Sequence, residues 1–221
     1  MGTDVAAPHN DRRVERGNRT RRLVLRRAVD VASVEGLEGL SLGRLAGELE
    51  LSKSGVFALF GSKEDLQLAA VRAATKIFAE HVIEPVRDLP PGLGRLWQVC
   101  AGWLGYSRER VFPGGCFFYS AAAEFDAREG KVHDALAEAR TGWFAFLEQV
   151  ARDAQKSGEM AADAEVPQLV FELAAFLEMA NAESVLHDEI TCYDKAANAI
   201  LNRLRGVATD PSALPERPRS Q

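Results

Sequence analysis

The residues best suited to chemistry lie between positions 41 and 66 of the 221-residue chain. Ser52 is placed to cap a short helix whose inner side carries Val56 and Phe60. The outer side of that helix presents a cation, a hydroxyl, an aromatic ring and a methyl group, from Lys53, Ser54, Phe57 and Ala58, and Gly55 leaves room for close approach. Reading the major groove of DNA requires such a helix, with polar side chains in front and a small core behind it. The segment therefore predicts a helix-turn-helix.

A preceding helix completes the motif. Its apolar residues fall at spacings of three and four, which is typical of one buried face: Leu42, Leu45, Ala46 and Leu49. Arg44 is expected to reach base edges or sugars, together with the outward residues of the second helix. Ser41 and Ser52 begin the two helices, where hydroxyls and free amides can hold phosphate, and Lys63 is also expected at the DNA backbone. The simpler alternatives are that the serines only cap helices and that Phe57 packs in the core.

The charge distribution supports DNA binding. The formal net charge is −5, yet eight arginines occur between positions 12 and 27 against one acid, Glu15: Arg12, Arg13, Arg16, Arg19, Arg21, Arg22, Arg26 and Arg27. A positive field at one end, with an acidic excess over residues 67–221, is expected when that end meets phosphate. Arg21 is accordingly predicted to bind DNA. A disordered, solvated tail is the alternative for residues 1–17.

The chain resembles the amino-terminal DNA-binding domain of the tetracycline-repressor (TetR) family of bacterial transcriptional regulators. The resemblance is carried by Thr20-Arg21, Val24, Ala28, Ser33-Val34-Glu35-Gly36, Leu40-Ser41, Leu45-Ala46, Leu51-Ser52-Lys53 and Phe60-Gly61-Ser62-Lys63-Glu64-Asp65-Leu66. Four positions depart from the family pattern: Ala32, Glu50, Phe57 and Leu59. Glu50 raises the free-energy cost of the corner between the helices, since this position favours a left-handed backbone, which glycine adopts more easily than glutamate. The resemblance implies a repressor that binds a palindromic operator as a homodimer.

Helical periodicity extends along nearly the whole chain, which predicts an all-α fold. Residues 1–18 are expected to be a disordered Arg-rich arm, 19–65 the DNA-binding domain, 66–206 a helical effector-binding and dimerisation domain, and 207–221 a disordered tail. Helices are predicted at 19–35, 62–83, 93–110, 116–126, 131–157, 166–188 and 191–204. In the family the last two helices form the dimer interface, here about residues 166–204.

The resemblance also implies a cavity for a small apolar or amphipathic effector between the central helices. The residues predicted to line it are Trp97, Cys100, Trp103, Phe117, Phe118, Tyr119, Phe125, Phe144, Phe176 and Met179. Glu124, Glu178 and Asn181 are candidate polar anchors, with Cys100 and Tyr119. The alternative is that most of these side chains fill the core.

Two other functions fit parts of the sequence. Cys116 follows Gly114-Gly115 at a helix start, where the helix dipole favours thiolate, so a redox- or electrophile-sensing regulator is an alternative. An architectural DNA-binding protein without an effector is another. No catalytic residues, metal ligands or cofactor sites are predicted, because the four histidines are scattered and no phosphate-binding loop occurs. No membrane span is predicted, and the three cysteines fit the bacterial cytoplasm.

Overall fold

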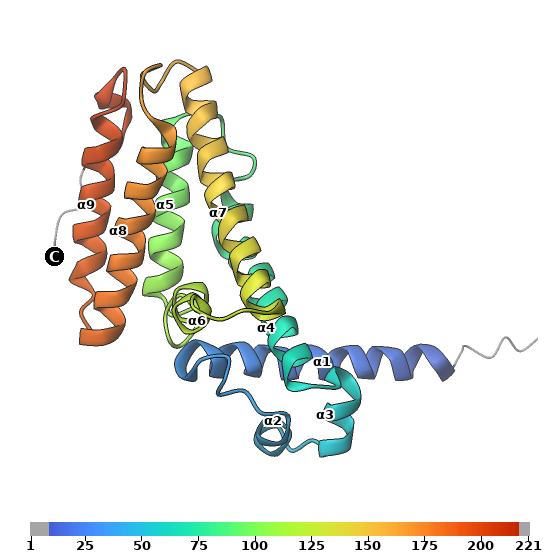
Figure 1. Ribbon diagram of the computed structural model, residues 1–221. Coiled ribbons are helices and arrows are strands. Elements are labelled where there is room, and N and C mark those ends of the chain that lie inside the picture. The colour runs from blue at the N-terminus through green and yellow to red at the C-terminus, as the bar shows by residue number, and fades with distance from the viewer. Residues whose placement is uncertain (1–8, 217–221) are drawn as a thin grey trace, which may run out of the picture.

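The amino-terminal helices form a three-helix head, residues 9–61. The computed structural model describes residues 9–216, with side chains from residue 15 onward. The head contains α1 (His9–Glu35), α2 (Leu42–Glu48) and α3 (Lys53–Phe60). Their apolar sides meet in a small core to which Val24, Ala28, Leu45, Val56 and Phe60 contribute. In Figure 1 α2 and α3 lie below α1, on the side away from the rest of the molecule.

The remaining helices form the body, residues 63–216. α4 (Lys63–Phe78) leaves the head and continues through a π turn (Ala79–Ile83) and a 3-10 turn (Glu84–Val86). α5 (Leu93–Arg108), α7 (Lys131–Lys156), α8 (Val166–His187) and α9 (Thr191–Arg205) then run side by side, as Figure 1 shows. The short α6 (Phe117–Phe125) lies at the lower end of these helices and contacts α1. The predicted all-α fold is confirmed.

Three features are absent from residues 9–216. No strand forms there, and the single β-bridge joins Met160 to Ala208. No helix in this range combines the length and the apolar character that crossing a bilayer requires. No cluster of three or more His, Cys, Asp or Glu side chains in this range is arranged to hold a metal ion.

The amino-terminal arm differs from its prediction. α1 begins at His9 rather than near residue 19, so residues 9–18 of the expected disordered arm are helical. No proline interrupts the chain between Pro8 and Pro85, and each turn added to an existing helix gains hydrogen bonds. The other residues of the expected arm, 1–8, lie outside the described residues.

The carboxyl-terminal tail also differs from its prediction. Residues 207–216 pack against the body, because Val207 and Leu214 are buried in its core. The backbone N–H of Thr209 donates to the carbonyl of Glu159 at 2.9 Å, which ties this segment to the end of α7. Residues 217–221 of the expected tail lie outside the described residues.

Candidate nucleic-acid interface and ligand cavity

The outer face of α3 is exposed. Ser52 caps this helix, since its hydroxyl accepts the backbone N–H of Gly55 at 3.1 Å. Val56 and Phe60 are buried on the inner side. The outer side exposes the residues that the sequence places there: Lys53, Ser54, Gly55, Phe57 and Ala58. Phe57 is 49% exposed, so the alternative that it packs in the core is wrong.

The corner between α2 and α3 has the left-handed backbone that the sequence predicts. Glu50 has a φ of 55°, a conformation that side chains other than glycine adopt at a cost of about 1 kcal/mol. The backbone N–H of Leu51 closes the corner by donating to the carbonyl of Ala46 at 2.8 Å. This turn sets the angle between α2 and α3.

Arg44 belongs to an ion-pair network that joins α1 to α2. Its guanidinium donates to both carboxylate oxygens of Glu35 and, at 2.7 Å, to Glu48. Arg27 of α1 donates to the other oxygen of Glu48 at 2.6 Å. The hydrogen bond from Arg44 lowers the pKa of Glu35, and those from Arg27 and Arg44 lower the pKa of Glu48. These ion pairs hold α1 and α2 together. The side chain of Arg44 is still about 39% exposed, so it also remains accessible.

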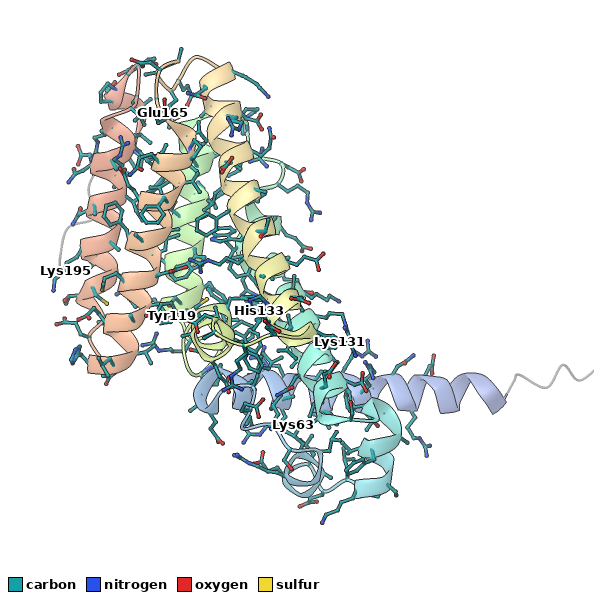
Figure 2. All side chains as sticks on the ribbon, viewed as in Figure 1. Lys63, Tyr119, Lys131, His133, Glu165 and Lys195 are labelled. Atoms are coloured by element: carbon teal, nitrogen blue, oxygen red, sulfur yellow. The ribbon has the colours of Figure 1, made fainter. Side chains whose placement is uncertain are left out.

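Two further predicted DNA-binding cations also hold helices together. Lys63, labelled in Figure 2, donates to the carbonyl of Glu38 at 2.6 Å and to its carboxylate at 2.9 Å. Arg21 of α1 donates to the carbonyl of Leu59 at 2.7 Å, and its guanidinium lies 4.7 Å from the ring centre of Phe60. Arg21 therefore fixes the carboxyl end of α3 against α1. Ser41 caps α2, as its hydroxyl accepts the N–H of Arg44 at 3.4 Å.

A cavity of about 510 Å³ lies in the body, above the head. Four aromatic side chains from four helices form much of its wall: Phe78 of α4, Trp103 of α5, Phe118 of α6 and Trp143 of α7. The rings of Phe78 and Trp143 meet edge to face with centres 5.1 Å apart. The polar side chains at the wall are Arg72, Thr75, Tyr119, Glu138, Arg140 and Glu178. Such a mostly apolar site with a few polar groups is typical of small-molecule binding.

Known proteins share this fold and part of this sequence. Residues 92–200 match the family model described as tetracyclin repressor-like, C-terminal domain. A TetR transcriptional regulator from Chloroflexus aurantiacus aligns with a TM-score of 0.81 at 19% identity, over 88% of this chain and 98% of that one. The chain belongs to the TetR family of transcriptional regulators.

Two further structures resemble this TetR-family chain. A transcriptional regulator from Saccharomonospora viridis in complex with choline has a TM-score of 0.75 at 18% identity, over 87% of this chain and 100% of that one. AibR in complex with isovaleryl coenzyme A and operator DNA has a TM-score of 0.66 at 17% identity, over 81% and 95%. No curated protein sequence gives a significant match. Family membership confirms the predicted class, a DNA-binding regulator that is not an enzyme.

The cavity of this TetR-family regulator contains only part of the predicted set. Trp103, Phe118 and Tyr119 line it. The predicted residues away from its wall are Trp97, Cys100, Phe117, Phe125, Phe144, Phe176 and Met179. Most of these pack in the core, but Phe176 and Met179 line a separate groove between α8 and α9. The sequence prediction did not include Phe78 and Trp143, which also line the cavity. For Phe78 the sequence held an indication, because Val71, Thr75 and Phe78 recur at helical spacing and therefore share one face of α4.

The polar anchors have different positions. Glu178 lines the cavity and accepts a hydrogen bond from Arg140 at 2.7 Å. Asn181 is buried elsewhere, where its side-chain oxygen accepts the backbone N–H of Cys116 at 2.7 Å and the hydroxyl of Ser107 at 2.9 Å. Glu124 of α6 contacts the head instead. Its carboxylate accepts the backbone N–H of Leu37 at 2.6 Å and that of Glu38 at 2.9 Å.

Cys116 is at the cavity wall but is not an activated thiol. It precedes the first residue of α6, as predicted, and only 4% of its surface is exposed. Burial raises the pKa of its thiol above the ordinary value of 9.0, although backbone N–H groups of Tyr119 and Phe118 act in the opposite direction. The helix start therefore does not produce the low thiol pKa that a reactive cysteine requires.

Proposed function

We propose that this TetR-family regulator is a repressor that binds a palindromic operator as a homodimer and is released by a small molecule in the cavity. Lys53, Ser54, Gly55 and Phe57, exposed together on the capped helix α3, carry the DNA-binding part of the proposal. AibR, which has the same fold, is known in complex with operator DNA. In this proposal residues 19–65 contact the operator and 66–206 bind the effector and the second subunit, in the bacterial cytoplasm.

An apolar stripe on α8 supports the homodimer. Phe171, Met179 and Leu186 recur at spacings of eight and seven residues, and 64%, 60% and 75% of their surfaces are exposed. Ala175 and Ala182 fall between them and would allow a second helix to approach closely. Burying such a stripe against its own copy is the usual solution for a two-fold oligomer. Figure 1 places α8 and α9 at one side of the body.

The cavity supports the effector. A volume of about 510 Å³ lies within the range of known small-molecule sites, about 300–1,000 Å³. Its aromatic wall suits an apolar group, and the polar side chains at the wall suit one polar end. This space favours a regulator over an architectural protein without an effector. The effector would release DNA only by binding the non-operator conformation more tightly.

Selection from random DNA tests the operator. The purified protein should enrich a palindromic sequence from a pool of random duplexes. On that duplex Lys53→Ala should lose about 30-fold in affinity, from about 1 kcal/mol for each of two contacts in a dimer. Lys156→Ala is the matched control, because Lys156 is an exposed cation near the end of α7. Failure to enrich any palindrome, or equal losses in the two variants, would contradict the proposal.

A thermal-shift screen tests the effector. Small apolar and amphipathic compounds that occupy the cavity should raise the melting temperature of the wild-type protein. Trp143→Ala should weaken this effect, because Trp143 forms part of the wall. A compound that binds there should also lower operator affinity in a mobility-shift titration. Ligands that stabilise the protein and leave operator affinity unchanged would contradict the release mechanism.

A further inference from the structure

The amino-terminal turns of α1 extend beyond the head. In Figure 1 α1 continues past α3, away from α8 and α9. The first buried residue of α1 among the described side chains is Val24, and no residue from 15 to 23 is buried. Arg21 contacts α3 and lies twelve residues after His9, a rise of about 18 Å at 1.5 Å per residue. We call residues 9–22 the helical arm.

The helical arm is strongly basic. It contains six arginines, Arg12, Arg13, Arg16, Arg19, Arg21 and Arg22, against two acids, Asp11 and Glu15. Arg16, Arg19 and Arg22 are exposed. Among the described residues, no ion pair joins these three side chains to an acid. The next arginine, Arg26, is occupied by Asp30 at 3.4 Å and by the carbonyl of Val111 at 3.0 Å, so the accessible charge lies on the arm.

The position of this charge is unfavourable for an isolated helix. Arg16, Arg19 and Arg22 follow one another at spacings of three residues, so their like charges lie close together along the helix and repel. Gly17 and Asn18 are also poor helix formers, and the described side chains of the arm bury no apolar surface that would compensate. An anionic partner along the arm would remove the electrostatic penalty, and a run of phosphates has the matching charge.

We propose that the helical arm binds backbone phosphates of DNA that flanks the operator half-site. This inference rests on the proposed operator binding. If α8 and α9 form the dimer interface, the two arms point away from the two-fold axis, outward along the duplex. An arm of about 18 Å covers about half a helical turn of DNA, since one turn is about 34–36 Å. It therefore reaches phosphates beyond the groove that α3 reads.

Two duplexes and one triple variant test the proposal. One duplex contains only the selected operator, and the other adds about one helical turn of arbitrary sequence at each end. The wild-type protein should bind the longer duplex more tightly and with a steeper salt dependence. Arg16→Gln, Arg19→Gln and Arg22→Gln together should abolish the difference between the duplexes. The slope of log K against log salt should become shallower by about 0.9 for each phosphate that is no longer neutralised, up to about 5 for six arginines in a dimer.

Matched variants separate charge from structure. Arg87→Gln, Arg152→Gln and Lys156→Gln remove three exposed cations at a distance from α1 and should leave the flank effect intact. Arg16→Lys, Arg19→Lys and Arg22→Lys keep the charge, and should keep the flank effect because a lysine also pairs with phosphate. Loss of the flank effect in the lysine variant would overturn the proposal, since charge would not be the cause.

The outcomes also distinguish this proposal from operator binding itself. If no duplex is selected, the proposed function fails. If the wild-type protein binds the operator but gains nothing from the added flanks, the arm proposal is overturned while the proposed function stands. Equal losses on both duplexes in the glutamine variant would place the arginines on the operator itself and also overturn it. Arginine-dependent binding to phosphatidylserine vesicles without a flank effect would assign the arm to a membrane surface instead.

Discussion

Replacing Glu124 with alanine should loosen the connection between α6 and the head. The Glu124 carboxylate accepts two backbone N–H groups, from Leu37 at 2.6 Å and from Glu38 at 2.9 Å. Gly36, with a φ of 80°, turns the chain so that both amides face this carboxylate. The N–H of Leu37 is partly buried, so losing its charged acceptor costs about 1.5–3 kcal/mol, whereas water can replace the acceptor at the exposed N–H of Glu38.

The expected effect of Glu124→Ala is therefore about 1.5–3 kcal/mol of unfolding free energy. For a chain of this size that corresponds to a fall of about 3–12 °C in melting temperature. Glu124→Gln keeps a neutral acceptor and should lose less. Circular dichroism measures the melting temperature, and hydrogen exchange resolved by residue measures the protection of the Leu37 and Glu38 amides, which should fall in the alanine variant.

The control is Glu129→Ala, which removes an exposed carboxylate from the loop that follows α6. It should change neither the melting temperature nor the exchange of Leu37. Unchanged protection of the Leu37 amide in Glu124→Ala would refute the reasoning, because the carboxylate would then not be its partner. An equal loss of stability in Glu129→Ala would refute it as well, since the effect would be one of net charge.

Three further outcomes are expected. Gly36→Ala should destabilise the protein, because Gly36 has a left-handed backbone and an added Cβ would lie 2.7 Å from the Glu124 carboxylate. The loss of unfolding free energy should be smaller when Glu124 is also replaced with alanine. A double-mutant cycle of unfolding free energies measures this difference. Met179→Glu should convert the proposed dimer into monomers in sedimentation velocity, because it places a charge on the exposed stripe of α8. The hydrogen bond from Arg44 lowers the pKa of Glu35 below 4.5, so its stabilisation is complete above pH 4.5 and is lost as the pH falls through the lower, folded value. Arg44→Ala should accordingly flatten the dependence of the melting temperature on pH below 4.5.

The helix-turn-helix could be predicted from sequence because its determinants are local. Ser52 followed by Val56 and Phe60 gives both the start of α3 and its buried side. The direction of Phe57 follows from that spacing, and the left-handed Glu50 follows from its place at the corner. The long helices also end close to their predicted bounds, since glycine, proline and capping residues mark those ends.

The cavity could not be predicted to the same degree because it depends on how five helices cross. An aromatic residue type indicates burial but does not say whether the ring faces a space or a neighbouring helix. α8 shows the difficulty: it is apolar on most sides, so Leu177 faces the cavity while Met179, two residues later, faces outward. The sequence also did not predict that the arm is helical. The composition of residues 9–18 favours disorder, but it does not show that a neighbouring helix can be extended through them.

α6 is the element through which an occupant of the cavity would act on the head. Phe118 at its amino end lines the cavity, and Glu124, six residues later and about 9 Å along the axis, holds the backbone after α1. Because packed helices move as units, displacement of Phe118 would move Glu124 and with it the loop that leads into α2. Under the proposed function, the effector and the operator then favour different positions of α6. Linkage requires that each lowers the affinity for the other by the same factor, and Glu124→Ala should reduce both factors together.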